Sequence, residues 1–189
     1  MNIRSLTTPL ALAAALGSGA AFEARATVVV PLTVEAMTAR ADVVCVGAVV
    51  AQHAAWNTER TRIYTTTEVR VERTLKGKRT AGEVITVRQL GGVVDGISQV
   101  VPGNARLTPG ETAVLFLDAD ETLPFHYVVG MAQGKFTVQP APDGARVTQD
   151  VHDLAFMPAP GVTPTEASPA PSPGRLDALE QAVRRATQP

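Results

Sequence analysis

The side chains best suited to bind a ligand gather in one basic stretch of the sequence, residues 60–88. This stretch contains eight basic and three acidic residues, whereas residues 111–153 contain two basic and seven acidic ones. Arginines near aromatic side chains favour anionic ligands, because a guanidinium attracts anions and aromatic rings add stacking. The candidate ligand-binding residues are aromatic and basic: His53, Trp56, Arg60, Arg62, Tyr64, Arg70 and Arg88.

The same stretch has an alternative interpretation as an ordinary solvated strand face. Glu68 and Glu72 alternate with the arginines, and such a pattern also suits a surface that only faces water. The whole chain carries 17 basic and 18 acidic residues, so its total charge gives no reason to expect nucleic acid or an anionic membrane as partner. We expect an unidentified protein or an anionic ligand instead.

No pattern typical of nucleophilic catalysis is found. None of the candidate nucleophiles lies in the G-x-S-x-G turn that exposes a catalytic serine; they are Cys45, Ser98, Ser168 and Ser172. Residues 77–80 resemble the end of a phosphate-binding loop, but Glu72 stands where that loop requires glycine. We therefore expect no catalytic residues; the alternative is a hydrolase with its site in the glycine-rich loop of residues 91–110.

Metal-ligating residues are present but not at ligand spacing. His53, His126 and His152 form no close pair, and no H-E-x-x-H or C-x-x-C motif occurs. The carboxylates of residues 118–121 lack the glycine and bidentate glutamate of a calcium loop. We expect neither a metal site nor a cofactor.

The first 26 residues are typical of an export signal. Arg4 precedes an apolar core at residues 10–16, and Ala24-Arg25-Ala26 fits a cleavage site before Thr27. This core is shorter than the roughly 20 residues that span a bilayer. We expect a periplasmic or secreted protein without a membrane span. Its single cysteine excludes an intrachain disulfide framework.

Residues 27–157 are expected to form one β domain that begins with a short helix, for which Thr33 is a suitable N-cap. Residues 43–50 are apolar on both alternating faces, which predicts a strand covered on both sides, with Cys45 buried and either a bend or a close backbone contact at Gly47. Residues 62–73 alternate between apolar and polar, the clearest strand signal in the chain. Further strands are predicted at residues 83–90, 112–117, 126–131, 136–138 and 146–148.

These elements predict an antiparallel barrel of six or seven short strands in mostly sequential order, because closure protects strand edges. A proline-rich linker, residues 158–173, contains six prolines and precedes a short amphipathic helix at residues 174–189. The apolar stripe of that helix, Leu176, Leu179 and Val183, has two possible partners: the barrel or another protein. We expect this tail to be dispensable for folding, since an isolated helix of this length is only marginally stable.

Three segments resemble the first three strands of an OB-like barrel of the netrin-like type: residues 41–49, 71–77 and 84–87. The series Gly91-Gly92, Asp95-Gly96 and Gly110-Glu111 is similar to that of exported bacterial proteins of unassigned function. The resemblance covers residues 41–138 and implies an OB-like barrel.

One feature of the netrin-like family does not carry over. Netrin-like metalloprotease inhibitors are disulfide-rich and reach the zinc of their target with an N-terminal cysteine, whereas the predicted mature N-terminus here is Thr27. We therefore expect an exported, non-catalytic binding or protein-interaction domain. The alternatives are the hydrolase named above and an assembly module that docks through its C-terminal helix.

Overall fold

A computed structural model describes residues 27–157, 169–170 and 172–188. The expected export signal and most of the proline-rich linker lie outside these residues. The described part is mainly β with two helices, and neither helix combines the length and apolarity needed to cross a bilayer.

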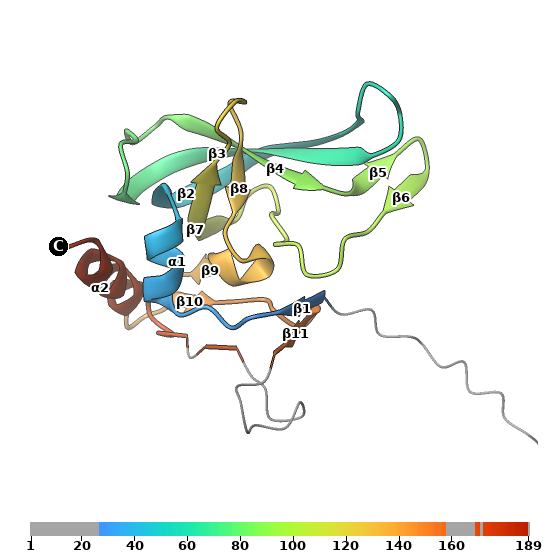
Figure 1. Cartoon of the computed structure of the whole chain (residues 1–189). Helices are drawn as coiled ribbons and strands as arrows, with labels where there is room; N and C mark the ends of the chain where they lie inside the picture. The colour runs from blue at the N-terminus through green and yellow to red at the C-terminus, as the bar shows by residue number, and fades with distance from the viewer. Residues whose placement is uncertain (1–26, 158–168, 171, 189) are drawn as a thin grey trace, which may run out of the picture.

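Five strands close into a barrel (Figure 1). They are β2 (Val43–Trp56), β3 (Ile63–Lys76), β4 (Val84–Leu90), β7 (Thr112–Ala119) and β8 (His126–Val128). Their order around the barrel is β2-β3-β4-β8-β7, and β7 pairs with β2 to complete the circle. The expected barrel is thus confirmed.

The prediction of a purely antiparallel, sequentially ordered barrel is wrong. β8 runs parallel to β4, with Val87 opposite His126, and antiparallel to β7. The connection after β4 carries the chain across the barrel, so β7 pairs with β2 and β8 fills the remaining gap. In a closed barrel with an odd number of strands, directions cannot alternate all the way round, and one neighbouring pair must be parallel. The barrel has five strands rather than six or seven.

Six shorter strands extend this barrel or lie beside it. β9 continues the sheet from the edge of β7. It pairs antiparallel with β10, so the strands predicted at residues 136–138 and 146–148 form a hairpin. β5 and β6 form a separate hairpin, and β1 pairs with β11 in parallel. Their bounds are β1 Thr27–Val29, β5 Gly92–Val94, β6 Ile97–Gln99, β9 Lys135–Gln139, β10 Arg146–Thr148 and β11 Leu154–Phe156.

The first barrel strand is buried on both faces, as its apolar pattern predicts. Val43 and Cys45 point into the barrel and join its interior core. Val44 and Val46 point outward into a second core beneath the helices. The thiol of Cys45 is inaccessible to solvent, and burial raises its pKa to about 12.

Gly47 makes the close backbone contact that its position in this strand predicts. A Cβ atom at this residue would lie 2.5 Å from Cγ1 of Val69 on β3. The pairing of β2 with β3 is irregular between Val46 and Gly47, so the missing side chain lets the two long strands bend around the barrel.

The two helices pack side by side over the outer core (Figure 1). They are α1 (Val34–Arg40) and α2 (Leu176–Thr187). Thr33 caps α1 as predicted, accepting a hydrogen bond from the Ala36 amide at 3.2 Å. Lys76 of β3 donates to two carbonyls at the C-terminal end of α1, Thr38 and Ala41, each at 2.7 Å. A 3-10 turn, Met131–Gly134, joins β8 to β9.

The apolar stripe of α2 belongs to the core of this same chain. Leu179 and Val183 are fully buried in the outer core, and an ion pair joins Arg73 of β3 to Glu180. The structure therefore places the C-terminal helix on its own barrel, and the stripe that suggested assembly through this helix is already covered. The N-cap residue of α2 is Arg175, whose side chain makes no capping hydrogen bond.

Candidate functional site

Aromatic and basic side chains meet on the outer surface of β3, β4 and β8. Side chains alternate along β3, so Ile63 and Thr67 point inward while Tyr64 points outward. On β4, Arg88 points outward from a position opposite Thr66, two residues along β3 from Tyr64. The guanidinium carbon of Arg88 lies 4.1 Å from the ring centre of Tyr64 and 4.8 Å from that of Phe125. We call these three residues the arginine clamp.

The guanidinium of Arg88 is held by aromatic rings rather than by an acid. No hydrogen bond or ion pair joins it to any described residue, and its Nε atom is buried without a partner. A guanidinium stacked on rings keeps its N–H groups in its own plane, where a planar anion can bind two of them at once. The clamp therefore presents a positive group whose pairing capacity is unused.

The loop before β8 brings Phe125 into the clamp. Asp120 fixes this loop by accepting hydrogen bonds from the Thr122 amide and hydroxyl and from the Leu123 amide, all at 2.9 Å. These bonds, together with one from Tyr127, lower the pKa of Asp120 to about 2. The carboxylate is thus ionised at neutral pH, and its oxygens are occupied by the loop.

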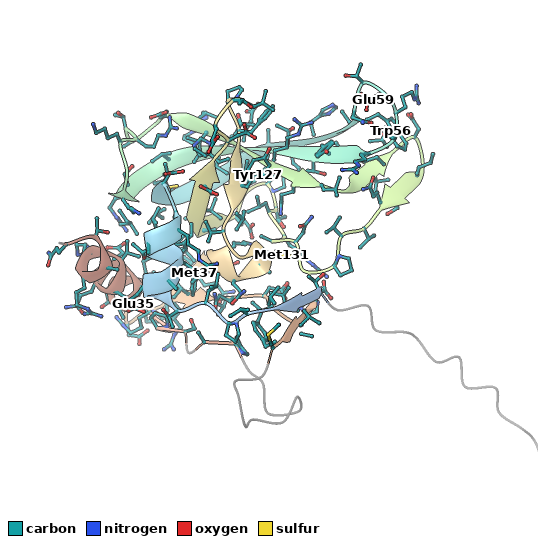
Figure 2. All side chains as sticks on the ribbon, in the orientation of Figure 1. Glu35, Met37, Trp56, Glu59, Tyr127 and Met131 are labelled. Atoms are coloured by element: carbon teal, nitrogen blue, oxygen red, sulfur yellow. The ribbon has the colours of Figure 1, made fainter. Side chains whose placement is uncertain are left out.

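Tyr127 extends the aromatic surface along β8, where Figure 2 shows its side chain. The ring is 38% exposed, and the hydroxyl donates to Oδ2 of Asp120 at 3.0 Å. Partial burial and this hydrogen bond raise the pKa of Tyr127, so the phenol stays protonated at neutral pH. It offers a flat, exposed ring of a type that often lies at binding surfaces.

Two other predicted ligand-binding residues, His53 and Arg70, lie on the same outer face of the sheet as the clamp. They lie at different distances from it along the strands. His53 on β2 lies opposite Thr66, and Thr66 lies opposite Arg88, so the three form one row across the sheet. Arg70 lies opposite Val84, six residues along β3 from Tyr64. His53 can therefore contact the same ligand as the clamp, while Arg70 reaches only an elongated one.

The remaining predicted residues lie at the end of the β2–β3 hairpin, and two of them are directed away from the clamp. Trp56 is the last residue of β2, opposite the inward-facing Ile63. Figure 2 shows it near the β5–β6 hairpin. Arg60 forms an exposed ion pair with Asp95 of that hairpin at 3.4 Å. Arg62 is exposed just before β3.

The structure thus brings Tyr64, Arg88 and His53 together and separates them from Trp56 and Arg60. Sequence reasoning missed Phe125 and Tyr127. A signal for them was available, because two aromatics flank His126 at the start of a predicted strand.

Within the described ranges, no serine–histidine pair forms at the 91–110 loop, where the hydrolase alternative places its site. Ser98 and Asp153 line the groove beside this loop, but no histidine does. The nearby His152 contacts Asp150 and Asp153 rather than a serine. Across the described ranges, no group of three His, Cys, Asp or Glu side chains is placed to hold a metal ion.

Comparison with known proteins adds no family to this description. Neither the scan against protein-family models nor the search of curated proteins returned a match for the chain.

Proposed function

We propose that this chain is an exported, non-catalytic binding module of the OB-like type. The support from the fold is the five-stranded barrel with one parallel pair, in which β3, β4 and the loop before β8 supply the three residues of the arginine clamp. OB-folds bind ligands on the face of their second and third strands and in the loops beside it. Counted in chain order within the barrel, the second and third strands are β3 and β4. The loop that joins the fourth strand, β7, to the fifth, β8, corresponds to one of the ligand-binding loops of the OB-fold.

The single observation that carries the proposal is the unpaired Arg88. Arg79, by contrast, pairs with Glu83 at 2.7 Å, and Arg106 pairs with Asp153 at 3.0 Å. A half-buried guanidinium without an acidic partner costs solvation free energy, and binding an anion recovers it. The clamp is therefore suited to a carboxylate or phosphate.

The ligand that fits this surface is an anionic oligomer with flat or apolar parts. Arg88 supplies the charge-assisted hydrogen bonds, Tyr64 and Tyr127 supply ring surfaces, and His53 lies in the same row. Asp120, the acid nearest Tyr127, is held by its own loop. A separate protein with an exposed acidic patch satisfies the same chemistry.

A binding titration with two anionic probes tests the proposal. The probes are a hexameric oligogalacturonate and a short polyglutamate peptide, with a neutral oligosaccharide as blank. We expect Arg88→Gln to weaken binding of at least one anionic probe by about tenfold or more, since hydrogen bonds to charged groups contribute roughly 1.5–3 kcal/mol. Tyr64→Leu should weaken it by a smaller factor.

Arg185→Gln is the matched control, because this arginine is exposed on α2, away from the clamp. It should bind the anionic probe as the unmodified protein does. The proposal fails if neither anionic probe binds, or if the Arg88 and Arg185 variants lose affinity equally.

A further inference from the structure

A groove lies on the barrel, lined by residues other than those of the arginine clamp. It is an open groove of about 390 Å³ between the barrel strands and the segment that follows β6. Its lining residues come mainly from β4, the β5–β6 hairpin and residues 100–107, with Gln52 and Thr65 contributed by β2 and β3. None of the clamp residues takes part, so the groove is a separate surface.

The floor of the groove consists of amide side chains that are held in fixed positions. Gln52 Nε2 donates to the carbonyl of Leu107 at 3.0 Å. Gln89 Nε2 donates to the carbonyl of Ala105, also at 3.0 Å. Asn104 donates in the same way to a carbonyl at the end of β4, at 2.7 Å. The side-chain oxygens of all three amides accept no hydrogen bond from a described residue, so they remain available to N–H donors.

The rim of the groove is apolar and exposed. Val93 and Val100 both line it, and they are 64% and 77% exposed. β6, which supplies Ser98 and Gln99 to the lining, pairs only with β5 among the described strands. One edge of β6 is therefore open to an added strand.

We propose that this groove binds an extended peptide segment of a partner protein. Amide oxygens accept from peptide N–H groups, the exposed valines contact alternate apolar side chains, and main-chain pairing at a strand edge adds affinity. The lining contains no aromatic ring, so it lacks the flat surface on which a sugar ring would stack. The groove volume lies within the roughly 300–1,000 Å³ of ordinary ligand sites.

The test is a titration of the full chain with a blocked tetrapeptide of alternating valine and threonine, followed by NMR of the side-chain amide groups. We expect the amide signals of Gln52, Gln89 and Asn104 to move, while that of Gln149, which donates to the Gln133 carbonyl elsewhere, stays in place. The same peptide with N-methylated backbone nitrogens should bind at least about tenfold more weakly, because it cannot donate to the amide oxygens.

Val100→Asp should weaken peptide binding by a similar factor. Val28→Asp, which changes another exposed valine, on β1 and outside the groove, serves as the matched control and should have no effect. The proposal is overturned if the tetrapeptide moves no groove amide, if the N-methylated peptide binds equally well, or if maltotriose moves these signals and the peptide does not. Loss of anion binding at the clamp would not alter any of these outcomes.

Discussion

At the scale of single residues, Arg88 is important for the proposed binding function but contributes little to the stability of the fold. Cation–π contacts with Tyr64 and Phe125 contribute roughly 0.5–2 kcal/mol, and leaving Nε buried without a partner costs a similar amount. These two effects oppose each other. Arg88 is therefore placed for a ligand, with little net effect on folding.

Replacing Arg88 by methionine should confirm this balance. We expect the free energy of unfolding to stay within about 1 kcal/mol of the unmodified protein, because an apolar side chain keeps contact with both rings and removes the buried unpaired nitrogen. Urea unfolding measures it. A loss above about 3 kcal/mol would show that the arginine is a structural residue.

Cys45 should be chemically inert in the folded protein. Its thiol is fully buried in the barrel interior, and burial raises its pKa to about 12, so almost no thiolate is present at neutral pH. A thiol reagent added without denaturant should leave it unmodified, whereas the unfolded chain should react once per molecule. Rapid labelling of the native protein would contradict the position of β2 in the core.

His126 should make stability depend on pH. Arg79 lies 3.0 Å from Nε2 and can only donate, so the ring accepts there and is neutral. Burial and the positive charge of Arg79 lower the pKa of His126 below the ordinary value of 6.5. Between the two pKa values the unfolded chain binds more protons, so stability is greatest above pH 6.5 and falls as the pH drops below it.

The measurement is urea unfolding of the unmodified protein and of His126→Gln at about pH 8 and about pH 5.5. The unmodified protein should lose more stability on acidification than the variant does. Equal losses in both proteins would show that titration of His126 does not cause the effect.

At the scale of elements, local patterns predicted the barrel strands and the pair β9 and β10, but not the short strands β1, β5, β6 and β11 or the way in which the barrel closes. The apolar run at residues 43–50, the alternation at residues 62–73 and the Thr33 cap all indicate elements that the structure contains. β2 continues to Trp56 through residues expected in a loop, because pairing with β3 satisfies that polar backbone. Such pairing is set by tertiary contacts and leaves no local signal.

The candidate site was only partly predictable for the same reason. Tyr64 and Arg88 lie on alternating strands, and their outward direction follows from the pattern. Phe125 joins them only because β8 runs next to β4, a neighbour relation fixed by barrel closure. Trp56 was expected beside the ligand, but its position on the strand turns it toward the β5–β6 hairpin.

Gly92 holds the β5–β6 hairpin against the barrel strands. Its φ of +139° is uncommon for other residues, and a Cβ atom there would lie 2.5 Å from Oγ1 of Thr65 and 3.0 Å from Cβ of Ala54. Gly92→Ala should therefore lower the free energy of unfolding by about 1–3 kcal/mol.

Gly96→Ala is the matched control for this change. Gly96 also has a positive φ, +76°, but nothing lies within 4 Å of its Cβ position. Its loss should be smaller, since only the backbone conformation is strained. Equal losses at Gly92 and Gly96 would show that the close approach of β5 has no energetic importance.

At the scale of the whole molecule, the chain builds two cores that share the same strands. The barrel interior contains Cys45 and Leu115, while the outer core contains Val44 and Phe116 from the same strands together with both helices. α2 is the last element of the chain and covers this outer core. Folding of the barrel and docking of the tail should therefore form one cooperative unit.

Removing every residue after Met157 tests whether the barrel and α2 fold as one cooperative unit. The sequence alone predicts a dispensable tail, but the burial of Leu179 and Val183 reverses that expectation. We expect the truncated chain to lose at least about 3 kcal/mol of stability, because replacing a single buried leucine by alanine already costs roughly 2–5 kcal/mol. Full-length Leu179→Ala should show a smaller loss, and Gln181→Ala, changed at an exposed position of the same helix, almost none. Thermal unfolding of the four proteins ranks them. If the truncated chain unfolds at the same temperature as the full-length protein, α2 adds no stability to the barrel, and the outer core is stable without it.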